Sequence, residues 1–250
     1  MRRRGALLLA LGALVAAAAG TAAWAALVKS SPRLTVLGAA SLTDVLPRID
    51  PAPRYSFAGS NALSTQVEQG APADVFASAN TRLPRELYAE GLVEKPVVFT
   101  ANALVLVVPR GNPGRIHSVF DLRRDGVKLV VAAEGVPAGD YTRTVLANLG
   151  LTGALDNVVS EESDVRDVLA KVALRAADAG FVYSTDARAV RGKVGVIGIR
   201  PSAEPTVAYA VAVVSASAHA ATARSYVRRL LGTAAQRRLR AAGFLPPPRG

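Results

Sequence analysis

The sequence predicts an α/β fold of two lobes, each a mainly parallel sheet flanked by helices, joined by a hinge that the chain crosses twice. Short β-rich runs alternate with amphipathic helices from Leu34 to Ala242, which is typical of sheets that carry helices on both faces. The loop Pro109–Pro113 interrupts this alternation. β-Rich stretches near 98–103 and 204–209 would carry the two crossings. We therefore expect lobe 1 at 31–101 and 208–250, and lobe 2 at 102–207.

The first lobe begins with strands that each lead into a helix. Strands are expected at 34–37, 55–58, 74–77 and 97–108, the last one broken at 100–102. Helices are expected at 42–49, from Ser60 to the Gly70–Pro72 stop, and at 83–90.

The second lobe repeats the pattern. Its strands are expected at 128–133, 158–160, 180–183 and 193–199, and its helices at 118–123, 137–149, 161–177 and from Ser184 onward. A strand at 206–214 then returns to the first lobe, and a closing helix over 218–242 ends at Gly243.

The first thirty residues have the features of an export signal. Three arginines follow Met1, and the 24 residues of Gly5–Val28 carry no charge. Ala23-Trp24-Ala25 fits a cleavage site, but a run of this length also suffices to span a bilayer. We interpret 1–30 as a signal peptide or an N-terminal membrane anchor, and place the protein outside the cytoplasm. Because the chain has no Cys, it is not expected to be a lipoprotein.

The net charge of +11 raises the question of nucleic-acid binding. Removal of residues 1–29 takes away four basic residues and no acid, which leaves +7. The remaining arginines are dispersed, apart from a group on the last predicted helix, and few aromatic residues accompany them. We therefore expect no binding to nucleic acid, although a positive surface would speed encounters with small anions.

Several predicted strands end where a helix starts, and free backbone N–H groups at helix starts form anion sites without basic side chains. The candidate binding residues at these places are Ser41, Ser60, Ala138, Val165 and Tyr183. The serines and Tyr183 offer hydroxyl groups, whereas Ala138 and Val165 can offer only the backbone. All are uncharged donors, which suits a fully deprotonated oxyanion. The alternative is structural: Ser60 caps a helix, Tyr183 packs, and the other two are ordinary helix-start residues.

Seven segments give the chain a wider resemblance. They are AASLT (39–43), FAGS (57–60), QVEQGAPADVF (66–76), VPAG (136–139), DVR (164–166), VYSTDA (182–187) and AGF (242–244). With these segments the chain resembles the substrate-binding proteins of molybdate ABC transporters, which have the type II periplasmic-binding-protein fold. In that family two serines, amides of the VPAG loop and the DVR segment, and a tyrosine hydroxyl hold a tetrahedral oxyanion. The resemblance implies these roles for the five candidate residues.

The resemblance also implies a function, namely extracytoplasmic binding of molybdate or tungstate for delivery to an ABC importer. Its partners would be a membrane permease and an ATPase, and the protein would be a monomer without a cofactor or a further metal site. No enzymatic activity is expected, because His117 and His219 are the only histidines and neither lies beside a serine motif. The alternative is a binding protein or sensor for another tetrahedral oxyanion, such as sulfate.

Overall fold

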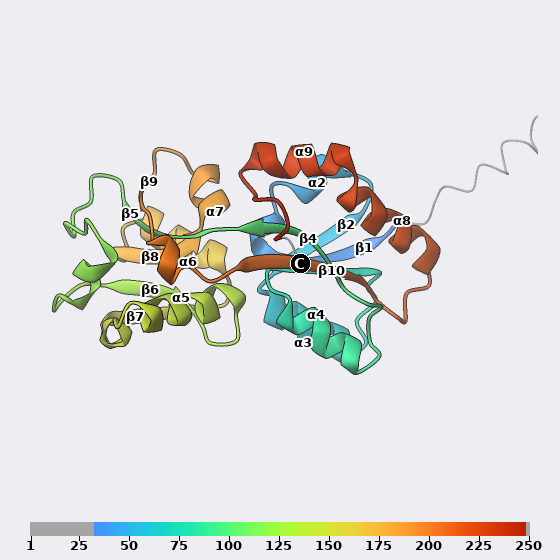
Figure 1. Ribbon diagram of the computed structural model, residues 1–250, viewed down its shortest axis with the longest axis horizontal. Helices are drawn as coiled ribbons and strands as arrows, with labels where there is room; N and C mark the ends of the chain where they lie inside the picture. Colours follow the sequence, from blue (N-terminus) through green and yellow to red (C-terminus); the bar gives the residue numbers. More distant parts are fainter. Residues whose placement is uncertain (1–32, 249–250) are drawn as a thin grey trace, which may run out of the picture. The chain divides into compact units, whose positions relative to one another are not determined.

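The computed structural model describes residues 33–248, so the expected signal or anchor at 1–30 lies outside the described residues. The described residues form one compact unit. Within it, the strands make two five-stranded sheets, ordered β2-β1-β3-β10-β4 and β7-β6-β8-β5-β9 (Figure 1). We call each sheet with its flanking helices a lobe. The residue bounds expected for the two lobes stay a prediction.

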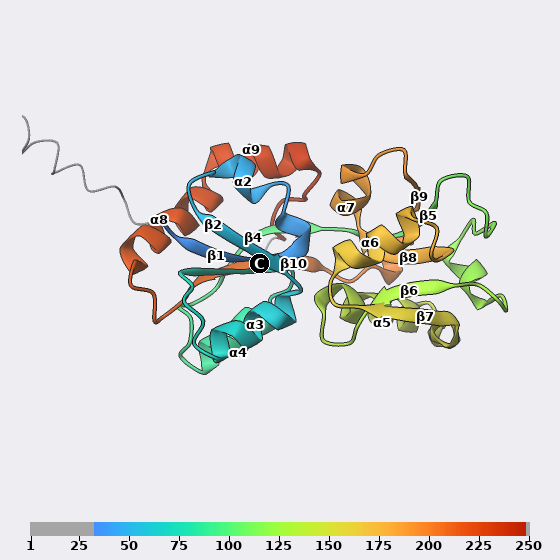
Figure 2. The ribbon, with the colours of Figure 1, turned by 180° about the vertical axis from the view of Figure 1, so that it is seen from behind.

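The first lobe contains β1 (Thr35–Ala39), β2 (Arg54–Ala58), β3 (Val75–Ser78), β4 (Val97–Asn102) and β10 (Val207–Val213). Its helices are η1 (Ala40–Leu42), α2 (Leu46–Ile49), α3 (Ser60–Glu68), α4 (Arg82–Ala89), α8 (Ala220–Leu231) and α9 (Thr233–Ala242). Helices α3 and α4 cover one face of the sheet, and α2, α8 and α9 lie over the other (Figures 1 and 2).

The second lobe contains β5 (Leu104–Pro109), β6 (Leu129–Ala132), β7 (Val158–Glu162), β8 (Ala179–Tyr183) and β9 (Val194–Ile197). Its helical segments are η2 (Val119–Arg123), α5 (Pro137–Asn148), η3 (Thr152–Asn157), α6 (Val165–Ala173), α7 (Ser184–Ala189) and η4 (Pro201–Ala203). Helices α5 and α6 both pack on β6 and β8.

Each sheet is mixed rather than mainly parallel, which corrects the prediction. In the first sheet β1 is parallel to β2 and β3, whereas β10 is antiparallel to β3 and β4. In the second, β6 is parallel to β7 and β8, whereas β5 is antiparallel to β8 and β9. The parallel strands are joined by the usual helical crossovers. The antiparallel pairs are made by β5 and β10, each of which enters its sheet directly after a crossing.

The chain passes between the sheets at Ala103 and again between β9 and β10, close to the two predicted crossings. Strand β4 runs through Thr100–Asn102, so the expected break lies at Ala103 instead. The closing helix is two helices, because Gly232 adopts an extended conformation between α8 and α9. Gly243 ends α9 with a φ of 101°, as expected for a left-handed cap.

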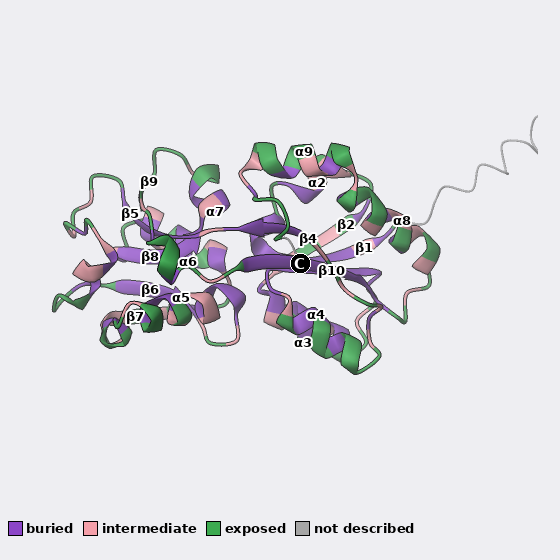
Figure 3. Ribbon diagram, viewed as in Figure 1, coloured by how far each residue is buried: buried purple, intermediate pink, exposed green. Residues whose placement is uncertain are grey.

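The central strands are buried on both faces. Every residue of β3, β5, β6, β8 and β10 is buried, whereas the helices expose their outer sides (Figure 3). Strands covered in this way read as continuous apolar runs and form the rigid core of each lobe. The loops at their ends are therefore held in fixed positions. Among residues 33–248 no helix is long and apolar enough to cross a membrane.

Candidate functional site

The structure brings all five candidate residues to the wall of one small cavity. Ser41 and Ser60 come from the first lobe, and Ala138, Val165 and Tyr183 come from the second. None of the five is more than 4% exposed. The sequence pattern thus identified residues that meet in space, although they are spread over more than half of the chain.

Ser60 is the first residue of α3 and follows Gly59, which holds the N-cap position. Ser60 therefore does not cap the helix. Its Oγ accepts a hydrogen bond from the Ala79 N–H at 3.0 Å, which leaves its own proton free for the cavity. Ser41 lies in η1, directly after β1, and its Oγ is 2.8 Å from Tyr209 Oη.

The two backbone donors lie at helix N-termini that reach the cavity. Pro137 is the first residue of α5 and has no N–H, so Ala138 offers the first free N–H of that helix. Val165 is the first residue of α6. The Asp164 carboxylate accepts the N–H groups of Arg166 and Asp167 at 2.7 and 3.2 Å, and it leaves the Val165 N–H uncapped. Both helix dipoles favour a negative charge in the cavity.

Tyr183 ends β8 and places its phenol in the cavity wall. Its hydroxyl is buried and has no hydrogen-bond partner among the described residues. Burial raises the pKa of Tyr183 well above its usual value, so the phenol keeps its proton. A buried donor without a partner costs about 1–3 kcal/mol. An acceptor oxygen in the cavity would remove that cost.

Two ion pairs link the lobes. Arg166 of α6 lies 2.7 Å from Asp44 of the first lobe, and its Nε is 2.7 Å from the buried Asp186 carboxylate, a close ion pair without the alignment of a hydrogen bond. Burial raises the pKa of Asp186 to about 6, against the opposing effect of the Arg166 charge.

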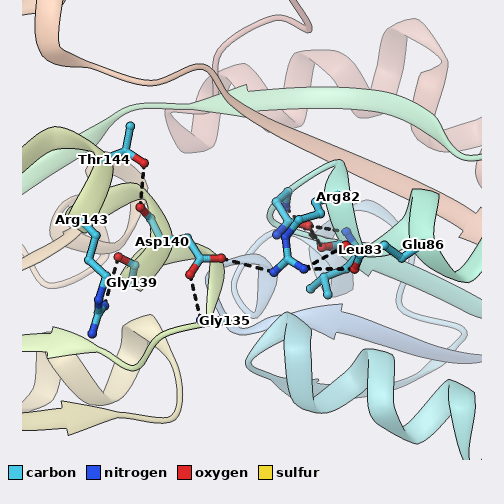
Figure 4. A network of polar contacts seen from close by, with 10 residues as sticks. Arg82, Leu83, Glu86, Gly135, Gly139, Asp140, Arg143 and Thr144 are labelled. Atoms are coloured by element: carbon cyan, nitrogen blue, oxygen red, sulfur yellow. Dashed lines mark hydrogen bonds and ion pairs between the residues drawn. The ribbon is translucent and has the colours of Figure 1, made fainter. Parts of the chain in front are cut away.

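The second ion pair joins α4 to α5. Arg82 lies 3.3 Å from Asp140 Oδ2, and Asp140 Oδ1 accepts the Gly135 N–H at 2.8 Å (Figure 4). Arg82 also contacts Glu86, four residues along the same helix, at 3.1 Å. Both interlobe pairs require the lobes to be close together, so they stabilise the closed arrangement.

A larger cavity of about 350 Å³ borders the small one, and Ser41 lines both. Its charged lining consists of four arginines and one acid, namely Arg48, Arg166, Arg188, Arg191 and Asp44. Arg166 is paired, whereas the described residues contain no ion pair to the other three arginines. The larger cavity is therefore electropositive and would attract anions toward Ser41.

Residues 34–245 match the family model of bacterial extracellular solute-binding proteins. The chain belongs to this family. It is 41% identical over 194 residues to the molybdate-binding protein ModA of Mycobacterium tuberculosis, which covers 77% of this chain and 73% of the relative. It is 33% identical over 234 residues to ModA of Haemophilus influenzae, covering 86% and 91%.

The periplasmic molybdate-binding protein of Azotobacter vinelandii has the same fold as this solute-binding protein. The two structures superpose with a TM-score of 0.78 at 23% identity, covering 86% of this chain and 100% of the other. The relatives confirm the resemblance stated from the sequence, and this structure confirms the two-lobe fold.

Sequence reasoning did not predict two residues that lie behind the site of this solute-binding protein. Tyr209 of β10 contacts Ser41, and Asn102 Nδ2 donates to Tyr209 Oη at 3.3 Å. No short motif could reveal this contact, because 168 positions separate Ser41 from Tyr209. One signal was that Tyr209 lies in a stretch predicted to cross between the lobes.

Proposed function

We propose that this solute-binding protein captures molybdate or tungstate outside the cytoplasm and delivers it to an ABC importer. One observation carries the proposal: three side-chain hydroxyl groups and two backbone N–H groups at helix starts, all from buried residues, converge on one small cavity. The described residues lining that cavity include no Lys or Arg. The five candidate residues are proposed to be the ligand-binding residues.

Such a set of donors suits a tetrahedral dianion that carries no proton. Each hydrogen bond to a charged oxygen is worth about 1.5–3 kcal/mol. The positive ends of α5 and α6 add stabilisation without a mobile counter-charge. The unpaired Tyr183 hydroxyl would gain an acceptor from the ligand.

We infer the selectivity from the proposed binding groups, which all act as hydrogen-bond donors. Phosphate near neutral pH keeps a proton, and burying that proton without a partner costs about 1–3 kcal/mol. The only acidic residue among the described lining residues is Asp164, whose Oδ1 already accepts two N–H groups. Sulfate has no proton, so only its smaller size disfavours it. Molybdate and tungstate are nearly equal in size, and the site gives no reason to separate them.

The relatives support the transport role. ModA proteins are named for molybdate binding, and the family is described as extracellular. In this role the N-terminal segment 1–30 would direct export or anchor the protein, and a permease and an ATPase would be its partners. We propose that the protein acts as a monomer, without nucleic acid and without enzymatic activity.

The test is a calorimetric titration of the purified protein with molybdate, tungstate, sulfate and phosphate. We expect tight and similar binding of molybdate and tungstate, weaker binding of sulfate, and hardly any binding of phosphate. Sulfate that matches molybdate would favour the alternative, a binding protein or sensor for another oxyanion. A protein that binds none of the four anions would overturn the proposal.

A further inference from the structure

The orientation of the Asn102 side chain is fixed by its neighbours. Its Oδ1 lies 3.0 Å from the Ala103 N–H and 3.0 Å from Ser184 Oγ. A backbone N–H can only donate, so the atom that faces it is the amide oxygen. The amide nitrogen therefore faces Thr185 Oγ1 at 2.9 Å and Tyr209 Oη at 3.3 Å, and it donates to both.

This orientation fixes the direction of the Tyr209 hydroxyl. Its oxygen accepts from Asn102, which has no acceptor to offer in return on that side. The other hydrogen-bond partner of Tyr209 among the described residues is Ser41 Oγ, at 2.8 Å. Tyr209 is fully buried, and burial holds its pKa well above the usual value, so the phenol keeps a proton to donate. That proton points to Ser41.

Ser41 is thereby turned toward the cavity as a donor. Its Oγ accepts from Tyr209, so its own proton points elsewhere, and Ser41 lines the cavity. A hydroxyl that already accepts one hydrogen bond is a stronger donor and a poorer acceptor for the next group.

The Tyr209 ring cannot easily turn away from this position. Its edge-on contacts are with Tyr183 at a centroid distance of 5.8 Å, with Phe99 at 6.3 Å and with Phe244 at 5.6 Å. Tyr209 therefore touches two of the five candidate binding residues, Ser41 through its hydroxyl and Tyr183 through its ring.

We propose that Tyr209 is a positioning residue that makes Ser41 a donor, and that it thereby contributes to the rejection of protonated oxyanions. The inference rests on the proposed function of the cavity. Asn102 donates a hydrogen bond to Tyr209, Tyr209 donates one to Ser41, and Ser41 is left to donate one to the ligand. A deprotonated oxyanion can accept the hydrogen bond from Ser41. The proton of hydrogen phosphate would instead need an acceptor, and the Ser41 hydroxyl is a poor one.

The test compares Tyr209→Phe with the parent protein for molybdate, sulfate and phosphate binding. Phenylalanine keeps the ring contacts and removes the donor. We expect molybdate and sulfate to bind about fivefold more weakly, the effect of about 1 kcal/mol for one hydrogen bond. Phosphate should bind no more weakly than to the parent, because Ser41 can then accept its proton. The molybdate-to-phosphate affinity ratio should therefore fall about fivefold or more, while the molybdate-to-sulfate ratio stays constant.

Tyr226→Phe is the matched control. Tyr226 is equally buried and has a hydroxyl contact at 3.4 Å to Tyr55, but it does not line the small cavity. The Tyr226→Phe variant should bind molybdate, sulfate and phosphate with the same affinities as the parent protein. A double-mutant cycle adds a readout that a packing role would not give: in a Ser41→Ala background, Tyr209→Phe should cause no further loss of molybdate affinity. In the parent protein, an NMR cross-peak between the Tyr209 hydroxyl proton and the Ser41 β-protons should show the donor direction without any variant.

The outcomes separate the two proposals. A parent protein that binds no molybdate overturns the proposed function and this inference with it. The inference alone fails if the parent binds molybdate while Tyr209→Phe keeps the parent selectivity. It also fails if the losses from Tyr209→Phe and Ser41→Ala are additive.

Discussion

Gly59→Ala tests whether the lobes have to close over the ligand. A Cβ on Gly59 would lie 2.3 Å from the carbonyl oxygen of Ser163. Gly59 belongs to the first lobe and Ser163 to the second. The Gly59 backbone, with φ −57° and ψ 136°, suits alanine. The other close neighbour, Asn61 Oδ1 at 2.8 Å, is the end of a side chain that can turn away. The clash is therefore between the lobes and not within one of them.

The size of the effect follows from the distances. Cβ contacts below 3.0 Å essentially do not occur, so the lobes would separate locally by about 0.7 Å. Ser163 is two residues before Val165. A ligand held by the serines at about 2.9 Å would then lie about 3.6 Å from the Val165 N–H, beyond the useful range of about 3.2 Å. The ligand would keep the donors of one lobe and lose at least two bonds. At about 1.5–3 kcal/mol each, this is a loss of roughly two orders of magnitude or more in affinity.

Calorimetry with molybdate and thermal melting without ligand form the assay. We expect weaker binding and an unchanged melting temperature, because the open protein has no clash. Gly153→Ala is the control, since its Cβ would meet nothing within 4 Å and its φ is not in the left-handed region. If Gly59→Ala bound molybdate like the parent, closure onto Ser163 would not be part of binding.

Three further predictions concern single features of the site. Tyr183→Phe should weaken molybdate binding about tenfold in calorimetry, because the ligand loses the hydrogen bond of a phenol that has no other partner among the described residues. Replacing Arg48, Arg188 and Arg191 with glutamine should lower the association rate of molybdate in stopped-flow measurements and make that rate less dependent on salt. The control replaces the exposed Arg54, Arg85 and Arg237 with glutamine and should change neither quantity. The pKa of Asp186 in the folded protein is raised to about 6. Between about pH 6 and pH 4 the folded state therefore binds more protons at this group than the unfolded chain does. The contribution of Asp186 to the free energy of unfolding should thus increase as the pH falls through this range. Asp186→Asn should remove that slope from melting temperatures measured across this pH range.

Local patterns together with the family resemblance predicted the candidate residues that the structure brings together. Gly59-Ser60, Val136-Pro137 and Asp164-Val165 each mark a helix start within a few residues, and a helix start determines where free N–H groups point. The carboxyl ends of strands in such folds lie at a common edge. For this reason residues up to 142 positions apart could be placed together before the structure was known.

Features that depend on distant contacts could not be predicted in the same way. Gly232 ends α8 inside an otherwise continuous helical pattern, because the chain has to turn back onto the first sheet. The antiparallel pairing of β10 with β3 and β4 joins segments more than 100 residues apart. From the sequence, Tyr209 is predicted only to be an aromatic residue in a buried strand. Only its neighbours, Asn102 and Ser41, give its hydroxyl a direction.

Among the described residues, the positively charged side chains lie outside the proposed binding cavity, and this has a physical consequence. A guanidinium inside the small cavity would attract any anion, protonated or not, and would weaken selection by hydrogen bonding. Arg166, the arginine of α6, is instead held by Asp44 and Asp186. Three arginines that have no ion pair within residues 33–248 line the larger cavity. Their long-range field acts on the rate of encounter, whereas the fixed neutral donors act only at contact. We therefore expect salt to change the association rate strongly and the ranking of anions little.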